Sequence, residues 1–213
     1  MNKEQEIKGD LVDINGVKID FLGAKNYILS RLENELPSNL KYHNLTHTLE
    51  VYLNVNKIAY YEKISNKEDL FLLRTAALYH DCGFLNNYCN HELESCNLAS
   101  KELLNFGYNN YHINKICKMI LATNINKIAV DPLEKIICDA DLDYIGRNDY
   151  YEISAFLEEE FYTYNVISNN HDWLKIQYNF LTNHKFYSKY SQNYRESRKK
   201  ERIIELTQKL NLF

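Results

Sequence analysis

Apolar residues recur every three to four positions along most of the chain, which is the spacing of one face of an α-helix. One such stripe lies over residues 45–62 and consists of Leu45, Leu49, Tyr52, Val55, Ile58 and Ala59. The same spacing predicts further helices over residues 24–36, 91–106, 111–122, 148–164, 171–183 and 188–212. No long stretch alternates strictly between apolar and polar residues, as a half-buried strand would. The pattern therefore predicts an all-α fold.

A further helix is predicted from the signals at its two ends. Asn66 can cap its start, and Asp69 follows three residues later, as in a capping box. The helix reaches the adjacent His80 and Asp81, and Gly83 is suited to the left-handed residue that often follows a helix. The sequence thus places an imidazole and a carboxylate side by side at a helix end.

Another helix start is marked by the run Asp131-Pro132-Leu133-Glu134. It combines a capping aspartate, a proline at the first helical position and a glutamate at the third. The helix that it predicts carries Asp141 about two and a half turns later.

The first twenty residues differ from the rest because they lack a long helical stripe. We expect a mobile N-terminal arm over residues 1–22, with a turn at Asn15-Gly16 and a small hairpin that pairs residues 11–12 with 17–19. The remaining residues, 23–213, are enough for one well-buried core and short for two. We therefore predict a single helical domain after the arm.

Composition narrows the function classes. The net charge of −4 argues against a broad electrostatic footprint for nucleic acid. No apolar run approaches the roughly 20 residues of a membrane span, and the polar, charged start does not resemble a secretory signal. The five cysteines include no C-x-x-C pair, so a disulfide framework is not expected. Together these features predict a cytoplasmic protein with reduced thiols.

Three segments place His and Asp residues at or near the ends of predicted helices. They supply four candidate metal ligands, which are His47, His80, Asp81 and Asp141. Imidazole and carboxylate bind borderline and hard divalent cations, and water can complete an octahedron. This donor set suits Mn, Mg, Fe, Co or Ni, and it also leaves Zn open.

The same residues resemble the HD-domain superfamily of metal-dependent phosphohydrolases. The family pattern of a His, then His-Asp, then a distant Asp maps onto His47, His80-Asp81 and Asp141. The surroundings are similar as well: Tyr-His-Asn-x-x-His-Thr from residue 42, His-Glu with a Ser at residues 91–95, Asp-Ala-Asp-Leu-x-x-x-Gly over 139–146, and a C-terminal pattern over 173–184. The resemblance covers residues 24–210.

The resemblance implies a single-domain helical bundle of the HD-domain type. The metal core would span about residues 42–147, and residues 148–212 would form C-terminal helices. Cyclic-nucleotide phosphodiesterases share the Tyr-His-Asn-x-x-His signature, and in them the first His protonates the leaving oxygen while the second binds metal. Carried over, His43 becomes the general acid and His47 a ligand, and Asp81 serves both as ligand and in catalysis.

The expected function is hydrolysis of a phosphoester or phosphoanhydride in a small molecule, for which we expect a mono- or cyclic nucleotide. Monoesterase, cyclic phosphodiesterase and pyrophosphohydrolase activities use the same metal core and remain open. The alternative is a non-catalytic HD-type module that senses a nucleotide. A third hypothesis is structural zinc held by Cys82, Cys89 and Cys96 with His91, but the spacing is irregular.

Secondary candidates surround the four ligands. His91, Glu92 and Asp143 could hold a second metal or orient a ligand. Two-metal family members place additional His residues between His-Asp and the final Asp, and here the candidates are His91 and then His112. We expect one metal, and a two-metal site would need help from Glu92 or His112. Arg74 and Arg147 are candidates for binding phosphate, since a guanidinium can bind it through two hydrogen bonds.

The remaining features are expected to be structural. His112, His171 and His184 have no partners in sequence that complete a site, so packing or surface roles are expected. The basic run over residues 195–202 is interrupted by glutamate, which is typical of a solvated helix face. The long terminal helix is a candidate surface for homo-oligomer formation.

Overall fold

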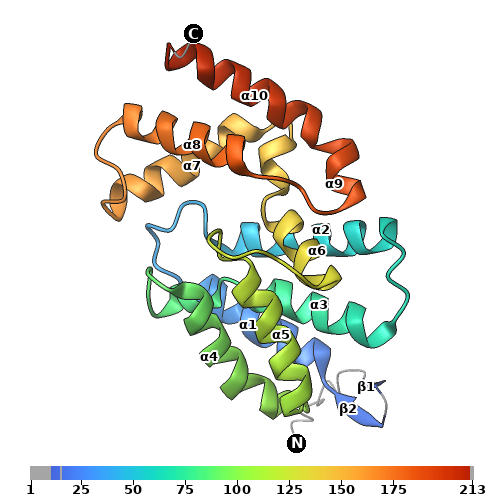
Figure 1. Cartoon of the computed structure of the whole chain (residues 1–213). Helices are drawn as coiled ribbons and strands as arrows, with labels where there is room; N and C mark the ends of the chain where they lie inside the picture. Colours follow the sequence, from blue (N-terminus) through green and yellow to red (C-terminus); the bar gives the residue numbers. More distant parts are fainter. Residues whose placement is uncertain (1–10, 15, 212–213) are drawn as a thin grey trace, which may run out of the picture.

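Helices make up most of the chain, as the apolar spacing predicts (Figure 1). The computed structural model describes residues 11–14 and 16–211. Over these residues the α-helices are α1 (Phe21–Glu35), α2 (Leu45–Tyr61), α3 (Lys67–Tyr79), α4 (His91–Glu102), α5 (Asn110–Ala122), α6 (Pro132–Asp141), α7 (Tyr150–Thr163), α8 (Asn170–Asn183), α9 (Lys189–Tyr194) and α10 (Glu196–Lys209). Short 3₁₀ helices occur at η1 (Cys82–Leu85), η2 (Leu103–Phe106) and η3 (Asp143–Gly146). The predicted all-α class is confirmed.

Side-chain caps fix the starts of the helices that matter most for the site. The carboxamide oxygen of Asn44 accepts hydrogen bonds from the backbone N–H groups of Thr46 and His47, so α2 begins directly after it. Asn66 caps α3, as predicted. Asp131 and Glu134 form a complete capping box at the start of α6. These caps set the point at which each ligand-bearing helix starts.

The predicted hairpin is present and belongs to the packed core. Strands β1 (Val12–Ile14) and β2 (Val17–Ile19) pair antiparallel, with Val12 opposite Ile19. Ile14 and Ile19 are buried in the main apolar cluster. The predicted turn residue Asn15 and the first ten residues of the predicted arm lie outside the described residues. The boundary between arm and domain at residue 22 stays a prediction.

The core consists of two large apolar clusters that share an edge at the site. The main cluster fills the space among α1 to α6 and the hairpin. The second cluster joins α7, α8 and α10 to two tyrosines beside the site, Tyr42 and Tyr144. In Figure 1 the helices α7, α8 and α10 lie above α1 to α6. The residues just before α2 and just after α6 therefore stand between the two parts.

Gly83 has a different role from the one predicted. It does not adopt the left-handed conformation, which among the described glycines belongs to Gly16 and Gly107. Instead, a Cβ atom at Gly83 would lie 2.0 Å from the carbonyl oxygen of His91. The Gly83 N–H also donates to the Ser95 hydroxyl at 2.7 Å. The glycine is needed because α4 approaches the backbone of η1 closely.

The long helix predicted over residues 188–212 is wrong in one respect. The described part of this segment forms two helices, α9 and α10, that meet at Arg195. The Arg195 guanidinium pairs with Asp143, and the Arg195 backbone packs against Gly146, where a Cβ would lie 2.5 Å from the Arg195 oxygen. The chain therefore bends at Arg195, because this contact holds it against η3.

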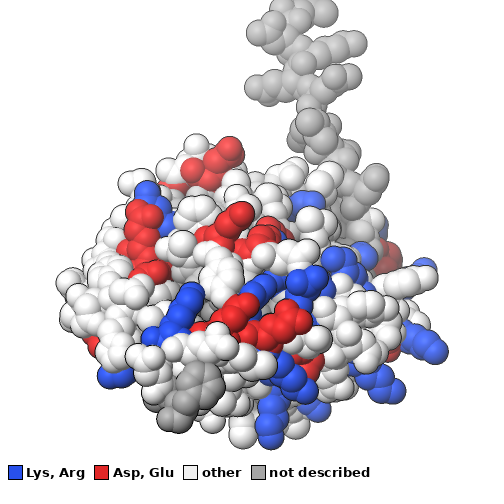
Figure 2. Space-filling model, turned by 90° about the horizontal axis from the view of Figure 1, so that it is seen from above, with Lys and Arg blue, Asp and Glu red and all other residues white. Residues whose placement is uncertain are grey.

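The basic run at the start of α10 is only partly a solvated face. Lys199 and Arg202 are buried, and the Lys199 ammonium donates to the carbonyl oxygen of His184 at 2.7 Å. Arg202 lies over the ring of Tyr151 and pairs with Glu205. On the face of the molecule shown in Figure 2, basic and acidic side chains are interspersed. Within the described residues, no helix is long and apolar enough to cross a membrane.

Candidate metal centre

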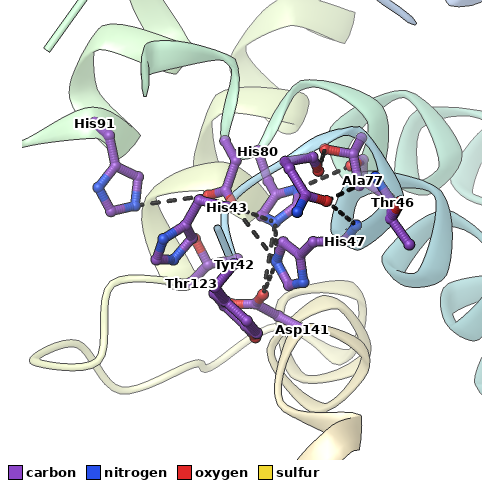
Figure 3. A network of polar contacts seen from close by, with 12 residues as sticks. Tyr42, His43, Thr46, His47, Ala77, His80, His91, Thr123 and Asp141 are labelled. Atoms are coloured by element: carbon purple, nitrogen blue, oxygen red, sulfur yellow. Dashed lines mark hydrogen bonds and ion pairs between the residues drawn. The ribbon is translucent and has the colours of Figure 1, made fainter. Parts of the chain in front are cut away.

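The four predicted ligands come together where α2, α3 and α6 meet, and Figure 3 shows three of them, His47, His80 and Asp141. His47 lies in the first turn of α2, His80 and Asp81 follow α3, and Asp141 is the last residue of α6. His47 Nε2 lies 3.0 Å from Asp141 Oδ1 and 3.3 Å from Asp81 Oδ2. His80 Nε2 lies 3.1 Å from Asp81 Oδ2 and 3.3 Å from His47 Nε2. Three helix ends thus direct two imidazoles and two carboxylates at one point.

The orientation of His80 suits a metal ligand. Its Nδ1 lies 2.9 Å from the carbonyl oxygen of Ala77, which can only accept a hydrogen bond. Nδ1 must therefore carry the proton and donate it to that oxygen. In the neutral imidazole, the lone pair is then on Nε2, which faces the cluster.

Asp81 provides a direct test of whether a cation fits. Its Oδ2 atom is buried and makes no hydrogen bond of good geometry in the described part of the structure. A buried carboxylate oxygen without such a partner is costly unless a cation or a charged group lies beside it. The distances from the two imidazole Nε2 atoms to the carboxylates of Asp81 and Asp141 are 3.0 to 3.5 Å and agree with a cation between them, although Asp81 is not part of the group whose ligand atoms all lie within 4.8 Å of one another. Neighbouring ligands bound at about 2.1 Å lie about 3.0 Å apart in an octahedron and about 3.4 Å apart in a tetrahedron.

The electrostatics of the cluster favour added positive charge. Burial alone would lower the pKa of His47, but the carboxylates of Asp141 and Asp81 beside it outweigh burial and raise the pKa to about 9. For His80 the two aspartates likewise outweigh burial and raise the pKa well above its usual value. Burial would raise the pKa of Asp81, but the two imidazoles hold it well below its usual value. Both carboxylates therefore attract positive charge, as protons on the imidazoles or as a bound cation.

The residues predicted for a second metal lie beside the first group. His91 Nε2 lies 3.6 Å from Asp81 Oδ1 and 3.6 Å from Glu92 Oε1. The amide of Asn124 donates to the same Glu92 oxygen at 2.9 Å. Of the described residues, only His47, His80 and Asp141 form a group whose ligand atoms all lie within 4.8 Å of one another. The arrangement favours one tight site, with His91 and Glu92 at its edge.

His43 lies next to the cluster and is held by a residue that the sequence analysis did not single out. Its Nδ1 atom is hydrogen-bonded to Oε1 of Glu160, a fully buried residue of α7. Glu160 Oε2 accepts from the backbone N–H groups of Tyr42 at 3.0 Å and His43 at 3.1 Å. Burial would raise the pKa of Glu160, but the hydrogen bonds from His43 and from these backbone groups lower it. Glu160 is therefore an ionised carboxylate that fixes the ring of His43.

A cavity of about 370 Å³ opens beside the cluster. Asp81, Asp141, His43, His91 and Glu92 line one end of it. Side chains of α7 and α8, which follow the predicted metal core, line the other end. They are Tyr150, Leu157, Phe161, Trp173, Ile176, Gln177, Phe180 and Leu181. A small molecule in this cavity would contact the metal ligands and His43 together.

The predicted phosphate-binding arginines do not line this cavity. Arg74 Nε donates to the carboxamide oxygen of Asn56 at 2.6 Å, away from the four ligands. Arg147 lines a smaller hollow on the other side of Asp141, where it pairs with Glu50 and Asp149. Each guanidinium is thus already bound to protein oxygens.

The aspartates on either side of Asp141 have structural partners. Asp143 pairs with Arg195, at 2.8 Å between Oδ1 and Nε. Asp139 accepts hydrogen bonds from the backbone N–H groups of Tyr187 and Ser188, and from the hydroxyl of Ser188. These contacts attach the chain around α9 to the end of α6.

The cysteines and the other histidines lie outside the cluster. In the described part of the chain, no cysteine belongs to a group that could hold a metal ion. Cys82 is packed against Ser95, and Cys96 against Cys117. His112 forms part of a capping box, His171 is exposed, and His184 is half-buried at the end of α8.

Glu160 and the walls of the cavity were missed by the sequence analysis. Glu160 belongs to a run of three glutamates, which resembles a solvated helix face. Its position held a signal, however, because it follows Ile153 by seven residues and Leu157 by three. It therefore lies on the apolar stripe of α7, where an acidic residue is expected only with a partner.

The comparisons with known proteins agree with this geometry. The HD domain family model matches residues 44–143, which include the four candidate ligands. The structure is similar to the crystal structure of a predicted HD superfamily hydrolase from an uncultured Thermotogales bacterium, with a TM-score of 0.57 and 20% sequence identity. That similarity covers 88% of this chain and 91% of the other. No curated protein matched the chain. Residues 44–143 of the chain therefore match the HD domain family, and the fold of the chain is similar to that of a predicted HD superfamily hydrolase.

Proposed function

We propose that this protein is a metal-dependent phosphohydrolase that cleaves a phosphate ester of a small molecule. The observation that carries the proposal is the position of His43, which lines the same cavity as Asp81 and Asp141. A phosphoryl group beside the two aspartates would place its ester oxygen within reach of the imidazole. The groups that bind the phosphoryl group and the imidazole that donates a proton can then act on the same ester bond.

His47, His80, Asp81 and Asp141 would hold the cation. The donor set suits Mn, Mg, Fe, Co, Ni or Zn. When bound, such an ion polarises a phosphoryl oxygen and lowers the pKa of coordinated water toward neutrality. The four residues also fix where the phosphoryl group sits, since the ends of three helices hold them.

His43 supplies the proton for the leaving oxygen. Because Nδ1 is engaged by Glu160, Nε2 is the nitrogen that remains to serve the substrate. The ionised carboxylate keeps the ring in one orientation and stabilises its protonated form before the transfer. A proton at that position assists most when the leaving group is a poor one, such as an alkoxide.

The nucleotide expected from the sequence is one candidate substrate within this proposal. A mono- or cyclic nucleotide would place its phosphate at the aspartate end and its base toward the aromatic side chains of α7 and α8. The alternative is a sensor that binds such a molecule without cleaving it. An enzyme and a sensor differ in one observable. The enzyme releases phosphate or the free hydroxyl product, and the sensor releases neither.

The test compares metal content and hydrolysis in the same preparations. We expect one divalent ion per chain by mass spectrometry, after reconstitution with Mn²⁺ or Mg²⁺ where needed. Asp81→Ala should lose the ion and at least 1,000-fold in turnover while keeping its helical content, an order of magnitude typical of an essential electrostatic group. Asp69→Ala is the matched control, because Asp69 pairs with Lys115 on the surface near the other end of α3.

Two results would overturn the proposal. One is full activity in Asp81→Ala. The other is a metal-loaded protein that binds phosphate esters but releases no product from mono- and diesters across a broad panel. The second result would establish the sensor alternative in its place.

A further inference from the structure

The cavity has two ends of very different chemistry. The acidic and imidazole groups that line it are the candidate ligands Asp81 and Asp141 and the residues beside them, His43, His91 and Glu92. The other end is formed by apolar and aromatic side chains of α7 and α8, among them Leu157, Phe161, Trp173 and Leu181. Of these, Trp173 and Leu181 are almost fully buried behind the surface. A substrate whose phosphate lies beside the metal ligands must therefore place its organic part against apolar side chains.

Among the described residues that line the cavity, none is lysine or arginine, and its basic groups are the imidazoles of His43 and His91. Arg147, six residues after Asp141, borders the separate hollow and pairs with Glu50. A second or third phosphate on the substrate would therefore lie among carboxylates and apolar groups without a cationic partner. Removing such a charge from water costs free energy that no cationic side chain here would offset, so the cavity suits a substrate with a single phosphate.

Most side chains that α7 and α8 offer to the organic part of the substrate are apolar or aromatic, and their polar groups are the hydroxyl of Tyr150, the indole N–H of Trp173 and the amide of Gln177. The amide of Gln177 already donates to the hydroxyl of Ser154. Tyr88 stacks face to face on Tyr164, with ring centroids 3.7 Å apart. A nucleoside carries hydroxyls and ring nitrogens that lose hydrogen bonds to water on burial. A hydrocarbon chain or an aromatic ring loses no hydrogen bonds to water on burial. Its binding free energy becomes more favourable in proportion to the apolar area that it buries.

On the basis of the proposed function, we propose that the substrate is a single-phosphate ester of an apolar alcohol, aliphatic or aromatic. The side chains of α7 and α8 select it. This assigns to the two helices the recognition of the organic group, and to the ends of α2, α3 and α6 the recognition of the phosphate. A nucleotide is then the poorer substrate.

The first experiment uses n-alkyl monophosphates from butyl to octyl. Their leaving groups have nearly equal acidity, so differences in kcat/KM report on contacts between the protein and the alkyl group. We expect kcat/KM to rise roughly fourfold for each added methylene until the cavity is full. Octyl phosphate should exceed nucleoside 5′-monophosphates by at least a factor of roughly 100. Nucleotides that outperform every alkyl and aryl ester would overturn the inference and leave the proposed function intact.

A pair of variants locates the effect on α8. Ile176 lines the cavity and is partly exposed, so Ile176→Ser should fold. We expect it to lower kcat/KM for octyl phosphate roughly tenfold and to leave that for butyl phosphate within a factor of about two. Ile204→Ser makes the same change on α10, at an exposed residue that does not line the cavity. Equal effects of the two variants would contradict the role of α8.

A binding measurement keeps the inference testable if no ester is cleaved. n-Butylphosphonate and n-octylphosphonate are titrated into the metal-reconstituted protein by calorimetry. Tighter binding of the octyl compound, lost in Ile176→Ser but kept in Ile204→Ser, supports the apolar subsite even when the proposed hydrolysis fails. Equal affinity for the two compounds overturns the subsite, whether or not the protein is a hydrolase.

Discussion

The carboxylate of Glu160 and the imidazole of His43 are in direct hydrogen-bond contact, although 117 positions separate them in the chain. The second oxygen of Glu160 accepts from two consecutive backbone N–H groups just before α2. One buried side chain thus orients the ring and also fixes the backbone that carries it. The contact links α7 to the HD domain at the point where the proposed chemistry occurs.

Glu160→Gln should lower kcat without removing the metal. The amide cannot stabilise a protonated imidazole as the carboxylate does, so we expect kcat to fall roughly 10- to 100-fold for alkyl phosphates. For 4-nitrophenyl phosphate, whose leaving group hardly needs a proton, the loss should stay below about threefold. Equal losses for both substrates would show that Glu160 acts only through the fold.

His43→Asn should remove the proton donor and leave the ligands in place. We expect kcat for alkyl phosphates to fall roughly 100- to 10,000-fold, the range of general acid catalysis. Metal content should stay within error of the unchanged protein. The double variant with Glu160→Gln should be no slower than His43→Asn alone, because the two residues act as one unit. Additive losses would refute that coupling.

Asp143→Ala should affect stability and spare the metal. The Asp143 carboxylate is almost fully buried and pairs with Arg195. Removing one partner of a buried pair leaves the other uncompensated, so we expect unfolding to become easier by about 3 kcal/mol in a denaturant titration. A variant of unchanged stability that loses its metal would instead make Asp143 a ligand.

Gly83→Ala should disturb the packing of α4 against η1. An added Cβ meets backbone atoms of His91 and Ser95 that cannot move away alone. We expect a loss of about 3 kcal/mol in stability, together with lower activity, because His91 and Glu92 border the cavity. Gly16→Ala is the comparison, since nothing lies within 4 Å of its added Cβ. Its positive φ alone should cost about 1 kcal/mol.

Acid should destabilise the protein in part through His184. Burial, with a contribution from the charge of Lys199, lowers the pKa of His184 from 6.5 to about 4. The unfolded chain therefore binds this proton more readily, and stability is lost as the pH falls from about 6.5 toward 4. The loss from this residue should reach at most roughly 3 kcal/mol. His184→Gln should flatten the pH dependence, whereas His171→Gln at an exposed position should not.

The positions of the helices and the proximity of the candidate ligands could be predicted because the signals are local. Asn66, Asp131 and Pro132 mark helix starts by chemistry that acts within one turn. His80 and Asp81 are adjacent, and a helix end was enough to place them together. The position of Asp141 at a helix end could be predicted from the start of its helix and the number of turns that follow.

The role of Glu160 and the break at Arg195 depend on contacts that are distant in sequence. Glu160 contacts His43, which lies 117 positions away in the chain. The two glutamates that precede Glu160 in the sequence suggest a solvent-exposed helix face instead. Arg195 bends the chain because Asp143 and Gly146 lie behind it. Helical spacing gives no information about such partners, since it describes one element at a time.

The separation of the cavity into a phosphate end and an apolar end has a consequence for how such a protein can diversify. Replacing side chains on α7 and α8 would change which molecules are accepted, while the reaction centre stays as it is. Glu160 of α7 is the exception, because it holds the imidazole of the proposed proton donor His43. A new specificity could therefore arise by exchanging the two helices, provided that the acidic residue at this position is carried along.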